Sequence, residues 1–123
     1  MPRSRTEQLI PFVHVADVQR SADFYALLGF RIGDTHEQDG WLLWCSIQSG
    51  QAKLMLTLAS TPVHQHEQAI LFYLYADDLD ALHGDLRDAG VVVGEIVDGS
   101  PGPEREFRLR DPDGYVLMVA QDE

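Results

Sequence analysis

The stretch Arg105–Gln121, which reads REFRLRDPDGYVLMVAQ, decides the fold of this chain. At its centre stand Asp111, Pro112, Asp113 and Gly114. Proline presets φ for the second position of a β-turn, aspartate can bond its own backbone, and glycine takes the left-handed conformation that closes the turn. The residues on either side of this turn are apolar at alternate positions: Phe107, Leu109, Leu117 and Val119. The stretch therefore predicts a β-hairpin with one core face.

The other face of this hairpin carries the residues that alternate with the core positions. They are Arg108 on the first strand and Val116, Met118 and Ala120 on the second. Because successive side chains of a strand point to opposite sides of a sheet, we expect these residues to face whatever the sheet encloses.

Composition limits the class of protein. The chain has 123 residues, enough for one domain, and its nine basic and 20 acidic residues give a formal charge of −11. This charge disfavours nucleic acid and favours a cationic ligand or partner. The single Cys45 lies among apolar residues, and no run approaches the length of a membrane span, so we expect a soluble, cytoplasmic protein without a membrane partner.

The first half of the chain predicts the order βαβββ. Asp17 is placed to cap a helix over Val18–Leu28, and Gly29 to end it. The predicted strands are Leu9–Val15, Phe30–Thr35, Trp41–Ile47 and Ala52–Ala59.

The second half repeats this order. Asp78 is placed to cap a helix over Leu79–Ala89, which Gly90 ends. The predicted strands are Ile70–Ala76, Val91–Val97 and the two arms of the hairpin, with a loop at Asp98–Pro103. We therefore expect a single α+β domain with a tail at 1–8, a first βαβββ module at 9–60, a linker loop at 61–68 and a second module at 69–123.

Two motifs carry a resemblance to a known family: VADVQRSADFYALLGF at residues 15–30 and REFRLRDPDGYVLMVA at residues 105–120. With the duplicated βαβββ order, they make the chain similar to the vicinal oxygen chelate superfamily, which contains glyoxalase I, extradiol dioxygenases and the bleomycin resistance proteins. The second motif resembles the bleomycin resistance branch most. The resemblance implies two modules with curved mixed sheets around a concave cavity, often completed by a second subunit in a homodimer.

The metal-dependent members of this superfamily hold a divalent ion with His, Glu or Gln side chains from four strands. The positions that match in this chain are Ile10, Met55, Leu71 and Met118, and none is a ligand for a hard divalent ion. We therefore expect no metal and no cofactor. The alternative donors are His14 on the first strand and the polar run His64–Glu67, which reads HQHE.

The alternation of the strands also predicts which residues line the cavity. The expected lining is aromatic and apolar with a few polar tips, which suits a planar, partly apolar ligand. If these residues instead fill a plain core, no cavity exists. The candidate ligand-binding residues are Phe12, His14, Trp44, Met55, Thr57, Leu71, Tyr73, Tyr75, Arg108 and Met118.

Three functions stay open. The first is a metal-free protein of antibiotic resistance type that binds and sequesters a small, planar compound, cationic or neutral, as a homodimer. Pro103 and Glu104 stand where the bleomycin resistance proteins carry a tryptophan before the Gly-Arg-Glu-Phe run, so bleomycin itself is disfavoured. The second is a metal-dependent lyase or dioxygenase of the glyoxalase type with an atypical site. The third is a non-catalytic dimeric interaction protein.

Overall fold

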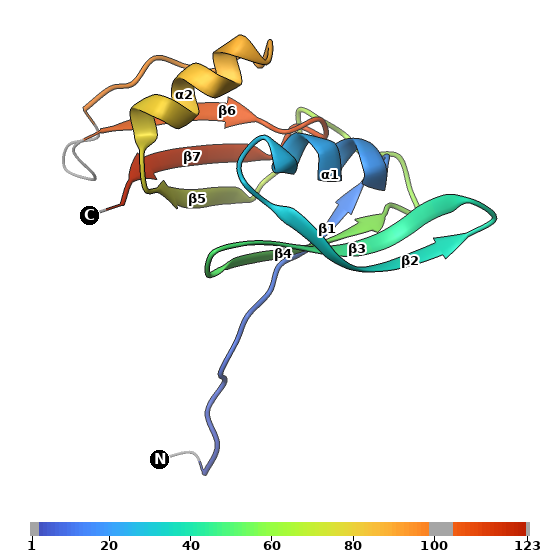
Figure 1. The fold of residues 1–123 in the computed structure, drawn as a ribbon. Helices are drawn as coiled ribbons and strands as arrows, with labels where there is room; N and C mark the ends of the chain where they lie inside the picture. The colour runs from blue at the N-terminus through green and yellow to red at the C-terminus, as the bar shows by residue number, and fades with distance from the viewer. Residues whose placement is uncertain (1–2, 99–104, 123) are drawn as a thin grey trace.

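The structure is a computed structural model that describes residues 3–98 and 105–122. This part of the chain forms two helices and two sheets, and the predicted α+β fold of βαβββ units is confirmed (Figure 1). The N-terminal sheet has the strand order β1-β4-β3-β2, and the C-terminal sheet has the order β5-β7-β6. The elements are β1 (Phe12–Val15), α1 (Val18–Ala26), β2 (Arg31–Gln38), β3 (Trp41–Ser49), β4 (Ala52–Leu58), β5 (Leu71–Ala76), α2 (Leu79–Asp88), β6 (Glu106–Arg110) and β7 (Val116–Gln121).

Both helices begin at the predicted caps. The side chain of Asp17 accepts a hydrogen bond from the backbone of Arg20, and Asp78 does the same for Ala81. Gly29 and Gly90 follow the two helices with φ of 93° and 84°. The regular part of α1 ends two residues before the predicted boundary, because its last amides bond the carbonyl three residues back, which tightens the final turn.

Two predicted strands differ from the structure. The first strand begins at Phe12 rather than at Leu9, which is 84% exposed and precedes the sheet. Residues 91–97 form only two isolated bridges to β6, one at Val93 and one at Val97. The five residues 93–97 of this segment lie opposite the four residues 106–109 of β6, so the extra residue interrupts the ladder as a bulge does. The rest of the predicted loop, 99–103, lies outside the described residues.

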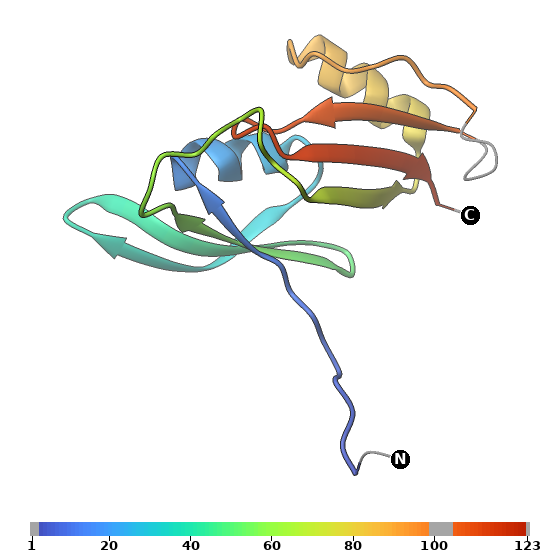
Figure 2. The same ribbon diagram turned by 180° about the vertical axis from the view of Figure 1, so that it is seen from behind.

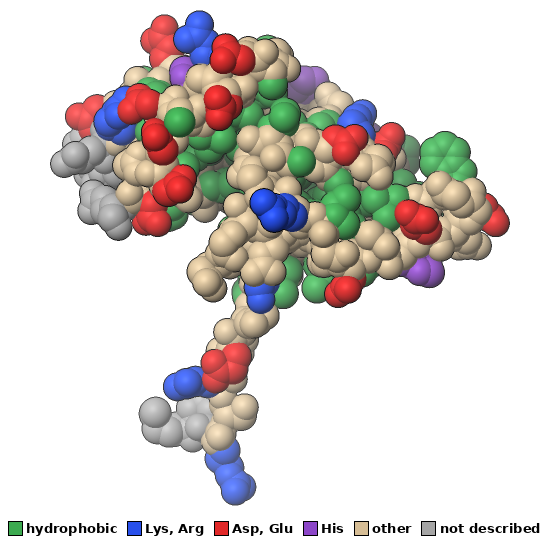
Figure 3. All heavy atoms as spheres, in the orientation of Figure 1, with side chains coloured by type: hydrophobic (Ala, Val, Ile, Leu, Met, Phe, Trp, Pro, Cys, Tyr) green, Lys and Arg blue, Asp and Glu red, His purple; other side chains and the backbone are tan. Residues whose placement is uncertain are grey.

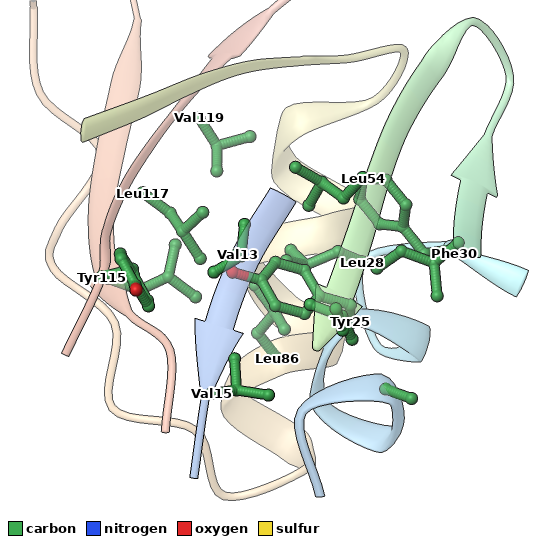
Figure 4. Packing of buried hydrophobic residues seen from close by; sticks show 14 of the residues in the cluster. Val13, Val15, Tyr25, Leu28, Phe30, Leu54, Leu86, Tyr115, Leu117 and Val119 are labelled. Atoms are coloured by element: carbon green, nitrogen blue, oxygen red, sulfur yellow. The ribbon is translucent and has the colours of Figure 1, made fainter. Parts of the chain in front are cut away.

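One hydrophobic core joins the two halves. Each helix packs on one face of its own sheet, and the buried side chains of both halves meet between the helices and strands. Figure 4 shows Val13 and Val15 of β1, Tyr25 of α1, Leu86 of α2 and Leu117 of β7 in this cluster. The residues before β1 run away from the body in both views (Figures 1 and 2).

The predicted turn at 111–114 is confirmed. The amide of Gly114 donates to the carbonyl of Asp111 at 3.0 Å, and Gly114 has φ of 84°. One side-chain oxygen of Asp111 accepts from the amides of Asp113 and Tyr115, both at 2.9 Å. This network is the local aspartate–backbone bonding that favours such turns.

The same turn also locks the hairpin onto α1. Asp111 and Asp113 are buried, and Asp111 accepts the hydroxyl hydrogen of Tyr25 at 2.7 Å. Asp113 accepts from the hydroxyl of Ser21 at 3.2 Å and from the backbone of Ala16 at 3.0 Å. Local chemistry alone predicts this turn. The carboxylates of Asp111 and Asp113 also connect it to α1, and so they hold the two sheets in a fixed orientation relative to each other.

Candidate functional site

The candidate residues of the N-terminal sheet lie on the face that α1 leaves uncovered. Phe12 of β1 pairs with Met55 of β4, one row away from His14 and Thr57. Thr57 also pairs with Trp44 of β3, so the second row runs His14, Thr57, Trp44 across three strands. The rings of Phe12 and His14 lie 5.9 Å apart. These five side chains therefore form one continuous surface.

The other five candidates lie on the uncovered face of the C-terminal sheet. Met118 of the central strand β7 pairs with Tyr73 of β5 on one side and with Arg108 of β6 on the other. Leu71 and Tyr75 flank Tyr73 on the same face of β5, and the rings of the two tyrosines lie 5.5 Å apart. This surface is aromatic on one edge and cationic on the other.

These side chains are accessible rather than packed in a plain core. Phe12 is 53% exposed and Tyr75 is 61% exposed, whereas Val13, on the opposite face of β1, is buried and Leu74, on the opposite face of β5, is partly buried. An exposed apolar surface of this kind is a candidate for ligand or protein binding.

Glu106 modifies the tyrosine edge of the C-terminal sheet. The hydroxyl of Tyr73 donates a hydrogen bond to the carboxylate of Glu106. This hydrogen bond raises the pKa of Tyr73 to about 12, so the phenol stays protonated at neutral pH. The carboxylate of Glu106 is thus hydrogen-bonded to a neutral hydroxyl from β5.

Two clefts in the described part of the chain lie beside candidate residues. One of about 990 Å³ lies between the end of α1, the β3–β4 turn, β5 and the start of α2, and Tyr73 and Tyr75 line its edge. The other, of about 260 Å³, lies beside His14, His64 and Glu67. Neither cleft contains the two candidate surfaces together, so one chain does not bring all ten predicted residues into one site.

The residues present do not fit the metal of the superfamily. The matching positions Ile10, Met55, Leu71 and Met118 offer no oxygen or imidazole donor. Within residues 3–98 and 105–122, no group of three or more His, Cys, Asp or Glu side chains is placed to hold an ion. The alternative donors in the His64–Glu67 run are therefore not assembled into such a group.

One residue of this surface was not among the candidates. Lys53 of β4 lies one residue pair away from Met55 on the same uncovered face, and its side chain is partly buried. The alternation with Leu54 predicts that Lys53 shares this face with Met55 and Thr57, and the structure buries Leu54 as that alternation requires.

Comparison with known proteins gives the family. The model of the glyoxalase/bleomycin resistance protein/dioxygenase superfamily matches residues 10–119. The chain belongs to this superfamily. No sequence match was found among curated proteins.

Solved structures share this fold. A bleomycin-binding protein in complex with bleomycin is 24% identical, with a TM-score of 0.76 over 96% of this chain and 100% of that chain. TnmS3, an antibiotic binding protein from Streptomyces sp. CB03234, is 24% identical, with a TM-score of 0.72 over 98% and 100%. A glyoxalase/bleomycin resistance protein from the same Streptomyces strain is 25% identical, with a TM-score of 0.66 over 91% and 97%.

No helix among the described residues is both long enough and apolar enough to cross a bilayer.

Proposed function

We propose that this protein binds and sequesters a small planar molecule without a metal ion and without changing it chemically. The observation that carries this proposal is the pair of exposed aromatic surfaces at the positions where the metal-dependent members of the superfamily hold their ion. Flat rings such as those of Phe12 and Tyr73 offer stacking area to a planar ligand, and thioethers such as Met55 adapt to its outline.

The site requires a second copy of the chain. The five candidates on each sheet form separate surfaces, and each has large apolar side chains in contact with water, Phe12 on one and Leu71 and Tyr75 on the other. A homodimer in which the N-terminal sheet of one chain faces the C-terminal sheet of its partner would cover both surfaces and enclose a ligand between them. Hydrophobic burial would drive this association.

The named relatives support a role in antibiotic resistance. One binds bleomycin, and TnmS3 is an antibiotic binding protein. Sequestration needs affinity but no catalytic group, which agrees with an uncovered face made of aromatic and thioether side chains. Cys45 is a free, buried thiol, which supports a cytoplasmic setting. The net charge of the chain predicts a cationic ligand, but the charges that line the two surfaces bear more directly on this question.

Tryptophan fluorescence tests the proposal. Trp44 lies on the uncovered face, whereas Trp41 is at the tip of the β2–β3 hairpin and is 73% exposed. We expect neutral 2-anthracenemethanol to quench the wild type and Trp41→Phe, and to quench Trp44→Phe much less. Light scattering after gel filtration should give the mass of a dimer for all three proteins.

The outcomes separate the candidate functions. A dimer whose Trp44 does not respond to any of a panel of planar compounds would support a non-catalytic interaction protein instead. A monomer that binds the probe with full affinity would show that the second copy is not needed for the site.

A further inference from the structure

Acidic and basic residues are distributed unevenly between the strands and the rest of the chain. In the described part of the chain, the seven strands contain four of the nine basic residues of the chain but three of its 20 acidic residues. The strands thus have a net charge of +1 in a chain of net charge −11, and the excess acid lies in helices and loops. Figure 3 shows acidic side chains gathered over α2.

The strand cations lie on the uncovered faces. Lys53 pairs with Gln48, which pairs with Arg31, so two cations share one row of the N-terminal sheet. On the C-terminal sheet, Arg108 and Arg110 alternate with the buried residues of β6. Both candidate surfaces therefore present cations beside their aromatic residues.

The carboxylates of the strands do not neutralise these cations. No ion pair within the described residues involves Arg31, Lys53 or Arg108. Glu106, which shares a face with Arg108, accepts the hydroxyl of Tyr73 instead. Glu37 pairs with Leu42 near the far end of β2, six residues along the chain from Arg31. Asp34 lies three residues from Arg31 on the same strand, and no ion pair among the described residues involves it.

Protection of sheet edges explains only part of this pattern. Charged residues on an edge strand prevent edge-to-edge association, and Arg31 is on the edge strand β2. Lys53, however, is on β4, which lies between β1 and β3. Its side chain is partly buried, and no ion pair among the described residues involves it, so the protection of edges does not account for this cation.

We propose that the planar ligand carries an anionic group, such as a carboxylate or an acidic phenol, which Lys53 and Arg108 bind. This inference rests on the proposed function. It assigns the ligand a negative charge, whereas the net charge of the chain predicts a cationic ligand. Charges in contact with the ligand dominate its affinity, because salt screens the more distant helical carboxylates beyond about 8 Å at physiological ionic strength. Arginine and lysine form strong charge-assisted hydrogen bonds with such anions.

Three probes with one ring system test the sign of the charge: 2-anthracenecarboxylate, neutral 2-anthracenemethanol and 2-(aminomethyl)anthracene. We expect the carboxylate to bind at least about tenfold more tightly than the ammonium compound, as one charge-assisted contact requires. Arg108→Gln and Lys53→Gln should each weaken binding of the carboxylate by about fivefold to tenfold and weaken binding of the neutral probe by clearly less.

Arg87→Gln is the matched control. Arg87 lies in the last turn of α2 and is exposed, so its loss changes the net charge equally without touching either surface. We expect no change in the affinity of the carboxylate.

The results distinguish this inference from the proposed function. The inference of an anionic ligand would be wrong if all three probes bind equally, if the ammonium compound binds more tightly, or if Arg87→Gln and Arg108→Gln lose the same affinity. The proposal of a planar ligand would remain in each of these cases. If no probe binds at millimolar concentration, the proposed function fails, and the inference fails with it.

Discussion

Tyr25→Phe should destabilise the protein through the charge state of Asp111. The hydroxyl of Tyr25 is the donor to one oxygen of Asp111, and the two backbone donors, from Asp113 and Tyr115, bond the other oxygen. Asp111 is 5% exposed, so water does not readily replace the lost donor. A hydrogen bond to a charged group contributes about 1.5–3 kcal/mol, and we expect a loss of unfolding free energy of this size at neutral pH.

The loss should depend on pH. Burial raises the pKa of Asp111, while the hydrogen bonds from Tyr25 and from the backbone lower it. A carboxyl whose folded-state pKa is raised takes up a proton more readily in the folded state, so its contribution to stability is full below the unfolded pKa and declines as pH rises through the folded pKa. Removing the Tyr25 donor lets this pKa rise further. The variant should therefore recover part of its lost stability as Asp111 is protonated on acidification.

Urea denaturation at about pH 7 and about pH 4.5 measures this effect, with Tyr115→Phe as the matched control. The hydroxyl of Tyr115 donates to the neutral backbone carbonyl of His14 at 2.9 Å. Its loss should cost only about 0.5–1.5 kcal/mol and should be the same at both pH values. If Tyr25→Phe costs no more than Tyr115→Phe, or if its cost does not shrink on acidification, the charge of Asp111 is not what the hydroxyl stabilises.

Three further predictions follow from single contacts. Gly114→Ala should destabilise the protein by clearly more than the about 1–2 kcal/mol of left-handed backbone strain, because a Cβ there would collide with the backbone oxygen of Gln65. Gly40→Ala, at a similar φ with nothing within 4 Å, should show the strain alone in the same urea assay. Leu86→Ala, at a fully buried position of α2, should cost about 2–5 kcal/mol in unfolding free energy, and a much smaller loss would contradict the close packing of Leu86 in the core. Glu106→Gln should lower the pKa of Tyr73 from about 12 toward the ordinary value of 10.0, and an unchanged NMR titration of the tyrosine carbon that bears the hydroxyl would contradict the hydrogen bond.

The faces of the strands could be predicted because a strand has a fixed alternation. Once Leu54 and Leu56 are assigned to the core, Met55 must point to the opposite face of the strand. In the structure the two leucines are buried and Met55 is partly exposed. The caps and terminal glycines of the helices could be predicted for a similar reason, since their chemistry is local. The division into modules at 9–60 and 69–123 stays a prediction.

Contacts between distant residues could not be predicted. The bond between Tyr25 and Asp111 joins positions 86 residues apart, and nothing in the local pattern shows that the aspartates of a turn are buried. The segment 91–97 has the apolar, β-branched composition of a strand, but its pairing depends on a bulge opposite β6. The net charge likewise gave no information on where the positive charges lie, because it is a sum over the whole chain.

The buried turn and the exposed sheets have complementary roles in the proposed site. The carboxylates at 111 and 113 fix the hairpin on α1, so the orientation of each sheet within a chain is set by a network that is far from the ligand. Alternate positions of each strand face either the core or the uncovered surface, but not both. The aromatic, thioether and cationic residues of the uncovered faces can therefore change without disturbing the core. This separation would allow the fold to carry apolar side chains such as Met55 at those positions and still present the proposed binding surface. In this chain, the residues that decide which molecule binds should therefore be sought among the exposed positions of β4, β5 and β6, where Lys53, Tyr73 and Arg108 lie.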